Sequence, residues 1–194
     1  MNANASEVET ARGLPTMSSF HGFFSLGGLF GAAIGGVLIG LGWGHGQGAL
    51  GMALACGVIL ALVTPRVMGF APHADGGSHF ALPRGAAVGL GLLALLCFAV
   101  EGALVDWSAL LMRERTGASE ASAALGFSAF SIAMAACRFA GDRMIVRFGA
   151  VRVMVIGGLA MFAGLALATT STHFALSACG FALIGLGAAN VVPL

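Results

Sequence analysis

The sequence contains no lysine and no tyrosine, and charged side chains of any kind are scarce. Among 194 residues there are nine basic and eight acidic side chains, 9% of the total, against 58% hydrophobic residues. The mean hydropathy is +0.96. Because a water-exposed surface needs many more ionic groups, this composition excludes a soluble globular protein and favours a membrane protein.

Other absences exclude further classes. No basic cluster is present, which argues against a nucleic-acid partner. No cofactor or metal is expected, since the five histidines lie at the ends of apolar runs or between them, and the four cysteines lie singly in different runs. No G-x-S-x-G elbow or evident pairing of Ser with His indicates an enzyme. The N-terminus also lacks the pattern of a secretory signal. The cysteines are Cys56, Cys97, Cys137 and Cys179.

Long apolar runs fill most of the chain. A helix needs about 20 apolar residues to cross a bilayer, and period-2 alternation, the mark of a barrel strand, is absent. We therefore predict an all-α fold, a polytopic membrane helix bundle with six transmembrane helices. The six runs cover residues 20–43, 49–64, 86–111, 122–139, 153–169 and 174–192.

The arginines predict the orientation, because basic loops stay in the cytoplasm. A cytoplasmic N-terminus places seven arginines inside and only Arg113 and Arg115 outside. It also puts Trp43 and Trp107 near the outer interface, where indole rings prefer to lie. The polar, proline-containing stretch 65–84 then becomes a cytoplasmic linker. The predicted inner arginines are Arg12, Arg66, Arg84, Arg138, Arg143, Arg147 and Arg152.

Two carboxyl groups lie within the third apolar run. Glu101 is near its middle, and Asp106 is about 7.5 Å further along the helix axis. A charge at mid-bilayer costs about 2.5–3.5 kcal/mol, and desolvation lets a deep carboxyl group carry a proton near neutral pH. We predict that Glu101 couples protons or contacts solute; a hydrogen-bonded structural Glu is the alternative. Asp106 either joins the pathway or pairs with Arg113 or Arg115.

The first run carries small residues four positions apart, at Gly27, Gly31 and Gly35, with Gly36 on a second such series. This spacing lets another helix approach closely. The fourth run has the same rhythm and is the predicted partner. The interface either is plain packing or is a surface on which helices rock.

Two further polar residues are weaker candidates for proton coupling or substrate binding, and one charged segment remains to be interpreted. His21 begins the first run, where it could titrate near physiological pH, and Asn190 lies in the last run. Between the fourth and fifth runs, residues 138–152 hold four arginines and Asp142. We predict that Asp142 pairs with a neighbouring arginine, Arg138 or Arg143, or caps a helix N-terminus, where the helix dipole favours an anion. The loop is then either a gating latch or a positive-inside loop whose acid is satisfied locally.

This segment resembles the signature loop of the major facilitator superfamily, G-x-x-x-D-R-x-G-R-R. The matching residues are Gly141, Asp142 and Arg143, followed by Arg147 and Gly149. The pattern from Gly27 to Gly36 also resembles the glycine-rich motif of the family's fifth helix, with Ala32 in place of proline. Segments 20–28 and 101–108 are similar to the branch that includes fucose-permease-like transporters and bacterial inner-membrane transporters.

The resemblance implies a position within a larger carrier. The six spans would match helices 5 to 10 of the family's twelve, so that helices 1 to 4, 11 and 12 are missing. Residues 1–64 would end the N-terminal bundle, residues 65–84 would form the cytoplasmic linker, and residues 85–194 would begin the C-terminal bundle. The implied location is a bacterial-type inner (plasma) membrane.

The sequence thus supports two functional hypotheses. The first is alternating-access transport of a small polar solute, such as a sugar, coupled to protons. The partners would be the solute, protons, the bilayer and the missing helices. The second is a truncated, non-transporting membrane protein that packs with other helices through its small-residue faces.

Overall fold

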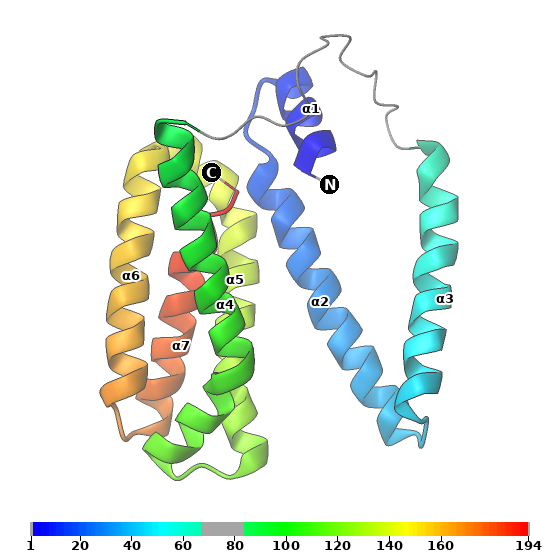
Figure 1. Ribbon diagram of the computed structural model, residues 1–194, viewed down its shortest axis with the longest axis vertical. Helices are drawn as coiled ribbons and strands as arrows, with labels where there is room; N and C mark the ends of the chain where they lie inside the picture. The colour runs from blue at the N-terminus through cyan, green and yellow to red at the C-terminus, as the bar shows by residue number, and fades with distance from the viewer. Residues whose placement is uncertain (1, 67–83, 194) are drawn as a thin grey trace.

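The computed structural model describes residues 2–66 and 84–193, and within these ranges every regular element is a helix (Figure 1). The predicted linker, residues 65–84, falls mostly outside the described residues. The all-α membrane helix bundle is confirmed. The elements are α1 (Asn2–Arg12), α2 (Met17–Gly40), α3 (His45–Val63), the short 3-10 helix η1 (Thr64–Arg66), α4 (Ala86–Thr116), α5 (Glu120–Phe148), α6 (Ala150–Thr170) and α7 (Phe174–Ala188).

Each predicted apolar run corresponds to one of the helices α2 to α7. Five of these, α2 to α6, are long and apolar enough to cross a membrane. The sixth, α7, is an apolar helix of 15 residues that continues into a turn at 189–193. The chain is therefore a multi-pass membrane protein by length and composition.

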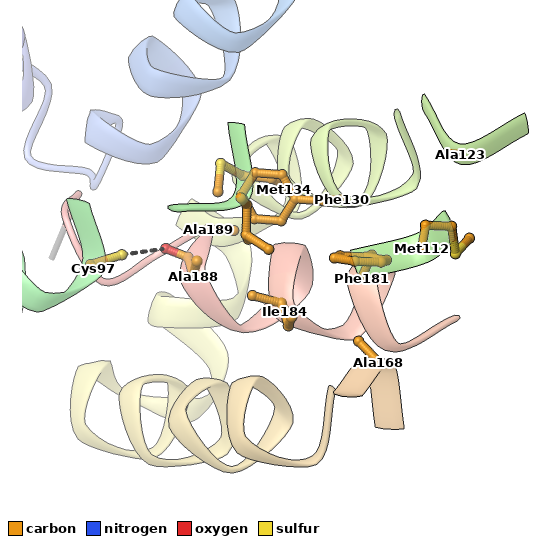
Figure 2. Close-up of a cluster of buried hydrophobic side chains, with 11 residues drawn as sticks. Cys97, Met112, Ala123, Phe130, Met134, Ala168, Phe181, Ile184, Ala188 and Ala189 are labelled. Atoms are coloured by element: carbon orange, nitrogen blue, oxygen red, sulfur yellow. Dashed lines mark hydrogen bonds between the residues drawn. The ribbon is translucent and has the colours of Figure 1, made fainter. Parts of the chain in front are cut away.

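Helices α4 to α7 form one bundle around α7. Figure 2 shows Phe181 and Ile184 of α7 in the middle of its core, with Phe130 and Met134 of α5 on one side and Ala168 of α6 on the other. Phe181 is fully buried and Ile184 is 1% exposed. Since lipid removes the hydrophobic drive between helices, this close packing is what holds the bundle together.

Glycines allow α6 and α7 to approach each other at backbone distance. A Cβ added at Gly180 would lie 2.6 Å from the Ala168 backbone nitrogen and 2.7 Å from the Gly164 carbonyl oxygen. A Cβ at Gly157 would lie 2.7 Å from the Gly187 carbonyl oxygen. A side chain at any of these positions would push the two helices apart.

Helices α2 and α3 lie beside the bundle as a separate pair. The N-terminal part of α2 rests against α5, and α2 then diverges toward a tight turn that leads into α3 (Figure 1). The membrane-spanning window of α3 is 0% buried, and its large apolar side chains are exposed. This pair therefore has little apolar core of its own.

The prediction that residues 138–152 form a loop is wrong. Helix α5 continues through Arg147 to Phe148, and α6 begins at Ala150, so that only Gly149 separates them. Arginine is a good helix former, and an excess of arginines does not end a helix. The break comes from Gly149, whose φ of +80° lies in the left-handed region that glycine adopts readily.

Candidate functional site: a polar seam between α2 and the bundle

Polar side chains gather where α2 meets the bundle. We call this group the polar seam; α2 supplies four members, α4 and α5 supply three, and one follows α7. Buried polar groups are costly in a membrane unless they find partners, and such groups usually mark functional positions. The members are Ser18, Ser19, His21 and Ser25 of α2, Glu101 of α4, Arg138 and Asp142 of α5, and Asn190.

Asp142 caps the N-terminus of α2 from a neighbouring helix. Its Oδ1 accepts a hydrogen bond from the Ser18 backbone N–H, and its Oδ2 accepts one from that of Ser19, each at 3.0 Å. The Ser19 hydroxyl also donates to Oδ2. The first N–H groups of a helix lack partners within it, and the helix dipole favours an anion there. Asp142 therefore ties α5 to the first turn of α2.

Glu9 of α1 completes the cap. Its Oε2 accepts hydrogen bonds from the backbone N–H groups of Thr16 and Met17, at 3.0 and 3.1 Å. Two carboxylates from two different helices thus accept all four N–H groups from Thr16 to Ser19. The end of α2 that is predicted to lie in the cytoplasm is therefore held by one carboxylate from α1 and one from α5.

Asn190 links the same turn of α2 to α5 and α7. Its Oδ1 accepts a hydrogen bond from the Ser18 hydroxyl at 2.9 Å, and its Nδ2 donates to Cys137 Sγ at 3.5 Å. Asn190 is 4% exposed. A Cβ added at Gly141 would collide with Asn190 Oδ1 and would lie 2.7 Å from the Ser18 hydroxyl oxygen. Gly141 is therefore the residue that lets three helices meet here.

Arg138 lies about 6 Å deeper along α5 than Asp142, and its guanidinium group is held on two sides. Nε donates to the Ala189 carbonyl oxygen at 3.2 Å, and Nη1 donates to the Ser25 hydroxyl at 2.6 Å. Nη2 lies 3.5 Å from Glu101 Oε1, and the two side chains are 5% and 23% exposed. This is the only ion pair among the residues that the structure describes.

The ion pair lies in the wall of a cavity between α2, α4 and α5. The cavity has a volume of 480 Å³, within the range of about 300–1,000 Å³ typical of small-molecule sites. Its polar lining residues are Ser25, Glu101, Ser131 and Arg138. The rest of the lining is mainly apolar and includes Phe24, Phe98, Phe127 and Phe130. A mostly apolar pocket with a few convergent polar groups is the usual form of a binding site.

His21 is a buried member of the seam. It is 9% exposed, and its Nε2 atom is buried without a hydrogen-bond partner among the described residues. Next to it, Phe23 of α2 meets Phe139 of α5 edge to face, with ring centroids 5.2 Å apart. A Cβ at Gly22 would lie 3.0 Å from the Phe139 ring. The Phe139 ring of α5 thus packs closely against α2 at the two residues that follow His21.

The structure gives the predicted latch different partners. Arg138 pairs with Glu101 rather than with Asp142, and Arg143 and Arg147 are exposed. Arg147 lies over the Phe148 ring at 5.2 Å. Asp142 instead accepts hydrogen bonds from N–H groups at the N-terminus of α2, which is the capping alternative, because these groups lack partners within the helix and the helix dipole favours an anion there.

Other predicted site residues lie apart from the seam. Asp106 is exposed and makes no hydrogen bond or ion pair within the described part of the chain, so its predicted pairing with Arg113 or Arg115 is not found. A Cβ at Gly27 or Gly35 would have no atom within 4 Å in the part of the chain that the structure describes, and one at Gly31 would lie 3.9 Å from Met52 Cε. Gly36 lies on the same helix, α2.

The sequence analysis did not single out Ser18, Ser19, Ser25 or Glu9 as site residues. Ser18, Ser19 and Ser25 supply hydrogen bonds that connect α2 to α5 and α7. A signal was present, because Thr16, Ser18 and Ser19 precede the first apolar run, as residues near a helix N-terminus often do. Which distant carboxylate would reach them could not be read from that signal.

Comparison with known proteins identifies relatives of this chain. The chain is 33% identical over 194 residues to an uncharacterized MFS-type transporter of Yersinia pestis, covering all of this chain and 50% of that protein. It is 34% identical over 196 residues to an uncharacterized transporter of Sinorhizobium fredii, covering 52% of it. The membrane protein MosC of Rhizobium meliloti is 36% identical over 104 residues, 54% of this chain and 26% of MosC. No protein family description and no solved structure matches.

The chain is therefore related, along its whole length, to proteins of the major facilitator type. The resemblance that the sequence motifs indicate is confirmed at this level. The chain spans about half the length of the two relatives that it matches in full. The fucose-permease-like branch stays a prediction, because the names of the relatives do not specify it.

Proposed function

We propose that this chain takes part in alternating-access transport of a small polar solute, coupled to protons, as part of a major-facilitator-type carrier. The observation that carries the proposal is the cavity between α2 and the bundle, with an ion pair of a buried Arg138 and a partly buried Glu101 in its wall. In alternating access, two helix groups rock about a site between them. Here α2–α3 and α4–α7 are the two groups, in keeping with a division into residues 1–64 and 85–194.

Glu101 is the proposed proton-coupling group. It borders the cavity, and its side chain is 23% exposed, so a proton can reach it from there. Arg138 cannot give up its proton in a protein, which leaves Glu101 as the member of the pair whose charge can change. His21 and Asn190 are proposed to support the same site from the seam. Asp106 has weaker support, because it lies outside the cavity lining.

Asp142 is the proposed gating residue. Its hydrogen bonds to Ser18 and Ser19 join the two helix groups at one end, and separating the groups there must break them. Arg143 and Arg147 are exposed near this end, in keeping with a cytoplasmic face and with a cytoplasmic N-terminus in a plasma (inner) membrane. The faces of α2 at Gly27 and Gly35, which no described residue covers, are proposed to pack against one of the missing helices of the carrier.

Two-sided labelling tests the proposal without a known solute. In a variant whose four native cysteines are replaced by alanine, Ser131→Cys places one thiol in the cavity. We expect a membrane-impermeant maleimide to label this cavity thiol from both faces, in right-side-out and in inside-out vesicles. The control Ser122→Cys, near the beginning of α5, should react from one face only.

The outcomes separate the two hypotheses. Labelling of the cavity thiol from one face alone, or from neither, would favour the non-transporting membrane protein. For coupling, a pH gradient should shift the labelling rate of the cavity thiol when Glu101 is present and leave it unchanged when Glu101→Gln is added. An equal pH response in both would remove Glu101 from the mechanism. Glu114→Gln, which changes an exposed acid on the same helix, is the matched control.

A further inference from the structure

The two members of the buried ion pair are held very differently. The guanidinium group of Arg138 is fixed by hydrogen bonds from Nε and Nη1 to groups on two other segments. Glu101 meets it through one oxygen at 3.5 Å, longer than the ~2.7–2.9 Å of a charge-assisted hydrogen bond. Its other polar contact within the described residues is from the Cys97 thiol, with Sγ 3.7 Å from Oε1. Arg138 is therefore a fixed cation, and Glu101 is a loosely held, exchangeable counter-ion.

A fixed guanidinium in a cavity wall is suited to a carboxylate. Its planar N–H fork matches two carboxylate oxygens at once, a geometry that Glu101 does not use here. A solute carboxylate entering the cavity can make these bonds, because Arg138 and Glu101 both border the same space. The solute would then replace Glu101 as the partner of Arg138.

Charge balance selects an anion over a cation. The cavity holds one positive and one negative group, so its net charge is zero. Adding an anion leaves one uncompensated negative charge, which is costly away from water, and protonation of Glu101 removes it. Adding a cation would leave an excess positive charge, and Arg138 cannot lose its proton to cancel it. Among charged solutes, an anion that arrives with a proton keeps the site neutral, whereas a cation does not.

The rest of the cavity wall indicates the chemical character of the uncharged part of the solute. Aromatic rings from α2, α4 and α5 line it, among them Phe24, Phe98 and Phe127. An inorganic anion would leave these rings in contact with water, whereas an organic acid covers them with its apolar part. A neutral sugar would find few hydrogen-bonding partners on such a wall.

We infer that the solute is a monocarboxylate with an apolar body, bound by Arg138 in exchange for Glu101, with one proton taken up per anion. This inference rests on the proposed function for its physiological meaning, but binding itself can be measured without transport.

The test uses the full gene product in lipid nanodiscs, with radiolabelled benzoate as the probe. Benzoate should bind at least tenfold more tightly at pH 5.5 than at pH 7.5, and benzamide, its uncharged analogue, should not displace it. In weak buffer, one proton should be taken up for each benzoate bound. Equal displacement by benzamide, or no proton uptake, would overturn the inference.

Two variants assign the roles of the pair. Glu101→Gln mimics the protonated acid, so it should bind benzoate at pH 7.5 about 10- to 100-fold more tightly than the parent and lose the pH dependence. The double variant Glu101→Gln/Arg138→Met should lose benzoate binding without leaving a buried charge unpaired. Arg113→Met, which changes an exposed arginine on α4, is the control and should bind like the parent.

Failure of this inference is distinguishable from failure of the proposed function. Weaker benzoate binding in Glu101→Gln would contradict the exchange of counter-ions, even if the double variant failed to fold. If the cavity thiol of Ser131→Cys is labelled from both faces while benzoate does not bind, transport stands and the anionic solute falls. If benzoate binds with its proton but that thiol is labelled from one face only, the site stands and transport falls.

Discussion

Glycine is abundant in both parts of the molecule, but it serves opposite structural purposes in them. In the α4–α7 bundle, a methyl group at Gly180 or Gly187 would meet the backbone of α6. On α2, a methyl group at Gly27 or Gly28 would meet no atom of the described residues within 4 Å. The same small-residue spacing therefore permits close packing without saying which partner uses it. Contact is decided by where the fold places the neighbouring helix.

The contacts at the boundary between the two parts differ from those within the bundle. Within the bundle, apolar side chains interlock around Phe181 and Ile184. Across the polar seam, the contacts include hydrogen bonds that Ser18 and Ser19 donate and one that Ser25 accepts from Arg138. Interlocked apolar cores do not slide continuously, whereas a hydrogen bond can be exchanged for one to water or to another group. Relative motion of the two parts therefore requires the hydrogen bonds of the seam to be exchanged.

The largest expected effect is in the bundle. Gly180→Val adds a branched side chain where Cβ alone would lie 2.6 Å from a backbone nitrogen. We expect a loss of about 3 kcal/mol in the free energy of unfolding, the upper end of the usual cost of overpacking. Denaturant titration of the purified protein in detergent measures it.

The matched control is Gly28→Val on α2, where the described chain leaves open space. It should change the free energy of unfolding by less than about 0.5 kcal/mol, as exposed substitutions usually do. Equal losses at Gly180 and Gly28 would erase the contrast between the two regions.

An intermediate effect is expected at the seam. Asp142→Asn removes the charge that caps the first turn of α2, at a cost of about 1–2 kcal/mol. Hydrogen exchange at the amides of Ser18 and Ser19 should accelerate about tenfold, while exchange in α7 should not change. Asp106→Asn, which changes an exposed acid on α4, serves as the control. Unchanged exchange at Ser18 in Asp142→Asn would show that the cap does not hold the two parts together.

The smallest effect is expected at α1. Glu9→Gln keeps an oxygen acceptor but loses the charge facing the Thr16 and Met17 amides. Exchange at these two amides should rise about two- to threefold, as for a loss of about 0.5 kcal/mol. Glu7→Gln, on the same helix without such a contact, should leave it unchanged. A larger effect at Glu9 than at Asp142 would mean that α1, rather than α5, holds α2.

Much of the fold could be read from the sequence, because helix length and apolar composition are local properties. All six apolar runs are helices, and Glu101 lies beside a cavity as a deep carboxyl group should. The end of α5 was not predictable in this way. The arginines of 138–147 do not resist helix formation, so the helix continues until Gly149 allows a positive φ.

The partners of the charged groups could not be predicted, because they depend on which helices become neighbours. Arg138 and Asp142 are four residues apart, a spacing that favours a pair within one helix. The fold instead brings Glu101 to Arg138, and the first turn of α2 to Asp142. Depth offered a clue, because Arg138 lies about 6 Å further from the end of α5 than Asp142 does.

The attachment of α2 near only one of its ends has a mechanical consequence. With 24 residues, the helix is about 36 Å long at ~1.5 Å per residue. A tilt of about 10° about the capped end would move the opposite end by about 6 Å, roughly twice the width of a water molecule. In such a tilt, the first turn of α2 stays in place because the carboxylates of Glu9 and Asp142 hold it, and the rest of the helix swings. By geometry alone, a small change of tilt at the capped end therefore becomes a displacement of several ångströms at the opposite end.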